Sequence, residues 1–308
     1  MVTNYGMMFG EKPKLVYTSP LEKGDHPELD TSEELDDEGT KKYQSLIGAI
    51  QWAVSIGRFD VATAVMTLSS FRAKPRVGHL ERAKRIIGYL AKMKNATIRF
   101  RAEEPDMSRF EKEVYGWEKT VYEGAKEIVP EDAPEKRGNR VTVITFVDAN
   151  LMHDIISGKS VTGILHFLNK TPSDWFSKKQ STVETATYGS EFVAARTATE
   201  QIIDLRTTLR YLGANICETT YMFGDNESVV KSASVPHAKL HKRHILLSFH
   251  RVREAIASGI LQFAHINGSE NPADILSKAW GYQQIWKMLQ PKLFWKGDTA
   301  NLMRYDGA

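Results

Sequence analysis

The stretch Val141-Thr-Val-Ile-Thr-Phe-Val-Asp-Ala-Asn150 is an apolar, β-branched run that leads into an acidic residue. Residues of these types favour strands, so the run predicts a strand that carries Asp148 at its carboxyl end. A second run, Tyr221-Met-Phe-Gly224, leads into Asp225 in the same way. Because open α/β sheets bind their ligands beyond the carboxyl ends of strands, both aspartates are candidates for a functional site.

The sequence around these two runs alternates short strand-like segments with helical periodicity. Strands are expected at 141–147, 161–168, 174–177, 219–223 and 260–266, and helices at 183–212, after Asn226, at 240–257 and from about Pro272. This order predicts an α/β fold, a mixed five-stranded sheet with flanking helices.

Two further acidic residues fall on the predicted helices. Glu191 shares a helix face with the small residues Ala194 and Ala195, and a carboxylate on such a face is costly to bury without a cation. Glu184 lies one face-repeat earlier and is the main rival, although an acid in a first helical turn is expected anyway. Asp274 opens the last helix, where its alternative role is to stabilise the helix dipole.

Together, Asp148, Glu191, Asp225 and Asp274 form an all-oxygen set. The single cysteine, Cys217, excludes thiolate metal sites and disulfides within the chain. Carboxylates suit hard cations, so Mg²⁺ is the expected cofactor, with Mn²⁺ able to substitute. Two such ions about 4 Å apart hydrolyse phosphodiesters, and we therefore expect hydrolytic phosphoryl chemistry on a nucleic acid.

The motifs around these acids resemble those of the ribonuclease H domain of copia-type LTR-retrotransposon polyproteins. The resemblance covers about residues 141–278 and rests on Phe146-Val-Asp-Ala-Asn150, Ser160-Val-Thr-Gly163, Trp175-Phe-Ser-Lys-Lys-Gln180, Ser190-Glu-Phe192, Gly224-Asp-Asn226, Lys242-Arg-His-Ile245 and Ala273-Asp-Ile-Leu-Ser-Lys278. It extends upstream to Tyr43-Gln-Ser-Leu-Ile-Gly48 and to 79–90, which resemble the end of the reverse transcriptase region.

The resemblance implies that Asp148, Glu191, Asp225 and Asp274 bind two metal ions. It also implies endonucleolytic cleavage of the RNA strand of RNA–DNA hybrids during reverse transcription, leaving 3′-hydroxyl and 5′-phosphate ends. His265 lies where many ribonucleases H carry a catalytic histidine, but its nine-residue spacing to Asp274 is about one short of the usual pattern. A histidine without a catalytic role at the sheet edge is an equal alternative.

Charge is strongly segregated in the first half of the chain. Residues 22–38 carry nine acidic residues against one lysine, and residues 72–101 carry ten basic residues against Glu81. The predicted domains are an extended acidic arm (1–40), a helical thumb or connection-like region (41–125), a linker (126–140), the ribonuclease H-like domain (141–290) and a tail (291–308). A polymerase palm needs a Tyr/Phe-x-Asp-Asp hairpin, and none is present. Polymerase activity is therefore not expected from this chain alone, and a separately supplied polymerase chain is a candidate partner.

A basic stretch can lie along the phosphates of a nucleic acid, so the expected partner is an RNA–DNA hybrid or other duplex. The candidate contacts, for which a solvated surface is the alternative, are Lys178, Lys179, Lys242, Arg243, His244, Arg82, Lys84 and Arg85. No membrane partner is expected, and the predicted location is intracellular, either cytoplasmic in a virus-like particle or nuclear. The rival functions are a catalytically inactive nucleic-acid-binding remnant and a transposase or integrase, whose acids normally come in the order Asp, Asp, Glu.

Overall fold

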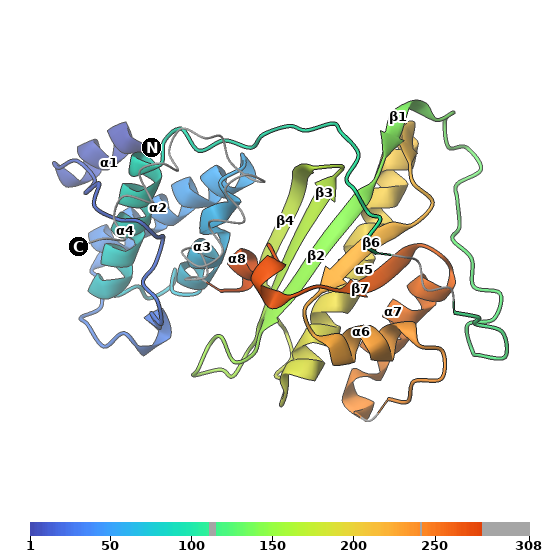
Figure 1. The fold of residues 1–308 in the computed structure, drawn as a ribbon. Coiled ribbons are helices and arrows are strands. Elements are labelled where there is room, and N and C mark those ends of the chain that lie inside the picture. Colours follow the sequence, from blue (N-terminus) through green and yellow to red (C-terminus); the bar gives the residue numbers. More distant parts are fainter. Residues whose placement is uncertain (111–114, 241, 279–308) are drawn as a thin grey trace.

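The C-terminal half of the chain is built on one twisted sheet (Figure 1). A computed structural model gives the structure of residues 1–110, 115–240 and 242–278. The sheet has the strand order β4-β3-β2-β6-β7, with β2 at Val143–Asn150, β3 at Val161–Leu168, β4 at Thr171–Lys179, β6 at Thr220–Gly224 and β7 at Leu261–His265. β2 is antiparallel to β3 and parallel to β6, and β7 is parallel to β6. The predicted mixed five-stranded α/β fold is confirmed.

Alternating side chains of β2 enter two different cores, as the period of a strand requires. Val147 and Ala149 pack under the helices that follow β4, whereas Ile144 and Phe146 join a core on the other face. The first of these faces is covered by α5 (Thr187–Tyr211), α6 (Glu227–Ser234) and α7 (Leu246–Ala257). The helix predicted at 240–257 begins later because residues Arg243–Ile245 form a 3₁₀ turn, η3.

The first 93 residues form a helical unit beside the sheet (Figure 1). It contains α1 (Val2–Phe9), the 3₁₀ turn η1 (Pro27–Leu29), α2 (Asp37–Ser55), the 3₁₀ turn η2 (Phe59–Val61), α3 (Ala62–Ser69) and α4 (Val77–Lys92). The Asp36 side chain caps α2 by accepting a hydrogen bond of 2.7 Å from the Gly39 amide. The helical region predicted at 41–125 is therefore present as far as Lys92, whereas the described residues from there to 125 form no helix.

The prediction of an extended arm at 1–40 needs correction in part. This segment contains α1 and η1, and it buries Tyr5 and Leu21 in the core of the helical unit. Its acidic residues pair with basic residues of α4, which holds the segment against the helix. Arg85 and Glu22, which are 63 residues apart in the sequence, thus lie side by side.

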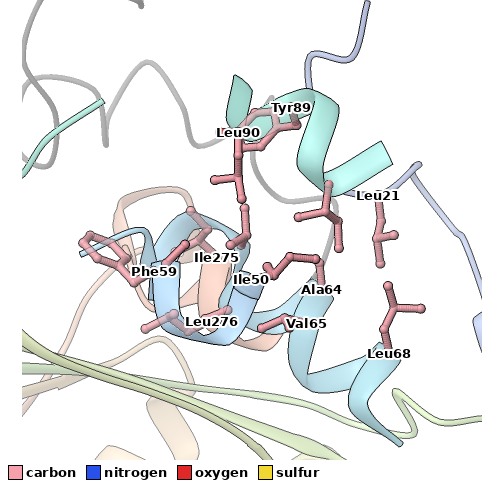
Figure 2. Close-up of a cluster of buried hydrophobic side chains, with 14 of the residues drawn as sticks. Leu21, Ile50, Phe59, Ala64, Val65, Leu68, Tyr89, Leu90, Ile275 and Leu276 are labelled. Atoms are coloured by element: carbon pink, nitrogen blue, oxygen red, sulfur yellow. The ribbon is translucent and has the colours of Figure 1, made fainter. Parts of the chain in front are cut away.

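The last described helix, α8 (Asp274–Ser277), packs between the sheet and the helical unit. Its residues Ile275 and Leu276 are buried in the core that also holds Phe59, Ala64 and Val65 (Figure 2). A 3₁₀ turn, η4 (Gly268–Glu270), precedes it. One hydrophobic core is therefore shared by segments from the two ends of the described chain.

A small parallel pair of strands, β1 (Arg137–Val141) and β5 (Ala214–Ile216), was not predicted. β1 places the end of the predicted linker against the end of α5. The predicted tail at 291–308 and the last twelve residues of the predicted 141–290 domain lie outside the described residues. Among the described helices, none is long and apolar enough to cross a membrane.

Candidate functional site

Three carboxylates from three different elements meet beside the carboxyl ends of the inner strands β2 and β6. Asp148 lies near the end of β2, Asp225 follows β6, and Glu191 lies in the second turn of α5. Each offers an oxygen, and these oxygens all lie within 4.8 Å of one another. β2 and β6 are parallel neighbours, so their carboxyl ends are adjacent, and the packing of α5 on β2 brings Glu191 to the same point.

Asp274 lies beside this group, at the start of α8. Lys278, one turn later, contacts the carboxylate of Asp274, and its ammonium nitrogen lies 3.6 Å from Oδ2 of Asp148. The hydroxyl of Ser277 donates a hydrogen bond to the same Oδ2. Three of the four predicted carboxylates are thus brought together in one group, and the fourth, Asp274, lies beside it and is linked to Asp148 through Lys278.

The site is electrostatically unfavourable for its own negative charge. Burial raises the pKa of Glu191 well above its usual value, and the nearby Asp148 and Asp225 raise it further. Burial, followed by the charge of Asp148, raises the pKa of Asp225 to about 6, and the same causes raise the pKa of Asp274. Because an added cation would relieve these like-charge contacts, and the donors are all carboxylate oxygens, the residues present fit one or two hard divalent cations.

Lys278 is the cation that the chain itself supplies. Burial alone would lower the pKa of Lys278, but Asp148 and Asp274 outweigh it and hold the pKa above its ordinary range. The ammonium group therefore stays charged at neutral pH. The sequence motif that ends in Lys278 was recognised, but no role was predicted for this residue; its spacing of four from Asp274 on a helix was the available signal.

Glu184, the rival of Glu191, has a different position. It precedes α5 and is buried, and its Oε2 lies 2.8 Å from Nε2 of His244. Glu184 is not in the three-carboxylate group. The structure therefore places Glu191 among the other acids and pairs Glu184 with a residue of η3.

His265 lies at the end of β7, next to Asp225. Its Nε2 is 3.1 Å from the backbone oxygen of Asp225, and the ring is exposed at the edge of the site. This is a contact with the backbone of Asp225 and not with a carboxylate. A role for His265 in the reaction stays a prediction.

The predicted nucleic-acid contacts fall into two groups. The first group belongs to the half of the chain that contains the sheet and comprises Lys178, Lys179, Lys242, Arg243 and His244. Lys179 pairs with Asp154 at 2.7 Å. Lys178 and Arg243 are exposed, on β4 and at η3.

The second group lies on α4 and is already engaged. Arg82 binds both carboxylate oxygens of Asp25 and also contacts Asp30, and Arg85 lies 2.7 Å from Glu22. Lys84 lies 2.9 Å from Glu81 and 4.0 Å from Glu11. These three basic residues thus pair with acids of the same chain, and none of them contacts the carboxylate site.

Comparison with known proteins finds relatives among transposon polyproteins. The chain is 24% identical over 237 residues to the retrovirus-related Pol polyprotein from transposon RE1 of Arabidopsis thaliana, covering 77% of this chain and 14% of that protein. It is 27% identical over 238 residues to the corresponding polyprotein from transposon TNT 1-94 of Nicotiana tabacum, covering 77% of this chain and 15% of that one. The chain thus spans about a seventh of the length of these relatives.

Among solved structures, LC11-RNase H1 in complex with an RNA/DNA hybrid is similar with a TM-score of 0.36 and 18% identity. The similarity covers 44% of this chain and 93% of that one. No protein-family model matches the sequence.

Proposed function

The chain is related to the retrovirus-related Pol polyproteins of transposons and has a ribonuclease H-like sheet, and on this basis we propose that it cleaves the RNA strand of RNA–DNA hybrids. The observation that carries the proposal is the meeting of Asp148, Glu191 and Asp225 within 4.8 Å. The proposed setting is retrotransposon reverse transcription, with polymerase activity supplied by another chain.

Asp148, Glu191, Asp225 and Asp274 are the residues that would hold two Mg²⁺ ions. Bound there, the ions would supply positive charge against the attacking and leaving oxygens of a phosphodiester. Asp148 is central because it lies close to Glu191, Asp225 and Lys278. Mn²⁺ has the same preference for oxygen ligands and would substitute.

The substrate would be held by charge and shape. Lys178 and Arg243 are exposed and available for backbone phosphates, which position a duplex without reading its sequence. Recognition of the RNA strand would rest on 2′-hydroxyls across a wide minor groove. The proposal therefore includes weak sequence preference and strong salt dependence.

The test is cleavage of a labelled RNA–DNA hybrid with Mg²⁺ by the full chain, the Asp148→Asn variant and the matched Asp174→Asn variant. Asp174 is an exposed aspartate on β4, so its variant is expected to cleave like the unmodified chain. Asp148→Asn is expected to lose cleavage but keep hybrid binding. Equal cleavage by both variants would contradict the proposal, and binding without cleavage by the unmodified chain would favour the inactive remnant instead.

A further inference from the structure

The helix that carries Asp274 is too short to hold its own position. α8 has four residues, and a helix of one turn is unstable unless tertiary contacts fix it. Whatever determines the place of α8 also determines where Asp274 and Lys278 lie relative to Asp148. The structure shows two such contacts, one on each side of the helix.

On the sheet side, α8 lies directly on the backbone of β3. Gly163 is paired with Asp148 across the ladder, and a Cβ atom added to Gly163 would lie 2.6 Å from the oxygen of Ala273 and 2.8 Å from the amide nitrogen of Ser277. Real Cβ atoms essentially never approach other atoms this closely. The absence of a side chain at Gly163 is therefore what lets α8 lie beside Asp148.

On the opposite side, α8 is held by the helical unit. Thr63 of α3, only 2% exposed, donates a hydrogen bond of 2.8 Å to the backbone oxygen of Ile275. The last carbonyls of a helix need partners from outside it, and Thr63 supplies one. Thr63 also accepts a hydrogen bond of 3.4 Å from Ser177 of β4, so one hydroxyl joins α3, α8 and the sheet.

Apolar packing strengthens the same contact. Ile275 and Leu276 are 3% and 0% exposed, and they pack in the core of the helical unit with Phe59, Ala64 and Val65 (Figure 2). The ring of Phe59 also packs against Trp175 of β4, with centroids 5.0 Å apart. The apolar side of α8 is thus covered by residues that precede it by about two hundred positions.

We propose that Thr63 is a positioning residue of the carboxylate site, which holds α8 and thereby sets Asp274 and Lys278 against Asp148. The inference rests on the proposed function, because it gives the helical unit a part in building the nuclease site. It requires no contact between the helical unit and nucleic acid. The site is thus assembled by both halves of the chain, although all four acids come from the second half.

The test uses the full chain with three substitutions. Thr63→Val removes the hydroxyl and keeps the volume, and Thr63→Ser restores the hydroxyl. Thr199→Val is the matched control, because Thr199 is fully buried on α5 and its hydroxyl donates to a carbonyl of its own helix, that of Ala195, at 2.8 Å. The two readouts are hydrogen exchange of the peptide that spans 273–278 without metal, and Mn²⁺ affinity by calorimetry.

Thr63→Val is expected to speed exchange in 273–278 and to weaken Mn²⁺ binding about tenfold, since leaving a buried carbonyl unpaired shifts an equilibrium by a factor of about that size. Thr63→Ser is expected to restore both values, and Thr199→Val to change neither. Unchanged exchange in Thr63→Val would overturn the inference, and so would faster exchange with unchanged Mn²⁺ affinity. If the unmodified chain bound Mn²⁺ without cleaving a hybrid, the proposed function would fail while these two readouts still decided the role of Thr63.

Discussion

The ammonium nitrogen of Lys278 lies 3.6 Å from a carboxylate oxygen of Asp148, at the point where the acids of the site meet. It also contacts Asp274 on its own helix turn. A divalent cation bound by these acids would approach the same oxygens. Lys278 and the metal are therefore competitors for Asp148 and Asp274.

Replacing Lys278 with methionine is expected to strengthen Mn²⁺ binding about tenfold, because the metal no longer displaces a charged group. The same change is expected to lower the stability of the metal-free protein, because the buried acids lose their only nearby cation among the described residues. Calorimetry and thermal melting measure the two effects. Lys231→Met, which removes an exposed lysine from its pair with Glu227, is the control and should alter neither; weaker Mn²⁺ binding by Lys278→Met would refute the competition.

Replacing Glu191 and Glu184 one at a time with glutamine should distinguish the roles of the two residues. Glu191 lies among like charges, so Glu191→Gln is expected to raise the melting temperature without metal and to weaken Mn²⁺ binding at least about tenfold. Glu184 is buried against His244, so Glu184→Gln is expected to lower the melting temperature and to leave Mn²⁺ binding unchanged. The opposite pattern would make Glu184 the metal ligand.

The acidic segment, residues 22–38, covers basic residues of α4. Asp25 and Asp30 both bind Arg82, so Asp25→Asn with Asp30→Asn is expected to free it for a phosphate. Hybrid affinity at low salt should increase, and the slope of log affinity against log salt should steepen by about one. Glu103→Gln with Glu104→Gln, at two exposed acids between α4 and β1, is the control. An unchanged affinity and slope would mean that α4 does not contact the hybrid.

Glu127 ties the segment between α4 and β1 to α5. Its two carboxylate oxygens accept hydrogen bonds of 2.6–2.8 Å from Arg206 and Arg210, and Arg206 is fully buried. Burial alone would raise the pKa of Glu127, but these arginines lower it to about 2. Glu127→Gln is expected to cost about 3 kcal/mol of unfolding free energy at pH 7, because it leaves a buried cation with fewer partners.

The pH dependence of this contribution follows from the lowered pKa. The folded pKa lies below the ordinary value of 4.5, so the stabilisation is complete above that value and is lost as the pH falls towards 2. Urea unfolding of the unmodified chain and of Glu127→Gln should therefore converge as the pH is lowered. Glu200→Gln, which breaks an exposed pair on the same helix, should cost less than about 1 kcal/mol at any pH. A constant difference for Glu127→Gln would contradict this assignment.

The sheet and the strand-end acids could be predicted because their signals are local. Asp148 and Asp225 each follow a short apolar run rich in strand-forming residues, and Glu191 falls on the small-residue face of a long helix. These features depend on periodicity over a few residues. The structure has them close to where they were predicted.

The contacts of α8 could not be predicted, because Thr63 and Ile275 are 212 residues apart and their hydrogen bond depends on tertiary packing. The opposite charges of residues 22–38 and of α4 could be seen in the sequence, but the ion pair between Asp25 and Arg82 could not. α1 was missed for a local reason, because it has no side-chain cap and carries Gly6 in its interior.

The shared core around Ile275 and Leu276 has a consequence for how the molecule comes apart. The helical unit cannot lose its structure without uncovering α8 and one face of the sheet, and the sheet cannot open without removing part of the core of the helical unit. Although the chain divides into a helical first part and a second part built on the sheet, we expect the described chain to melt in one cooperative calorimetric transition. Two resolved transitions would show that each half is stable alone.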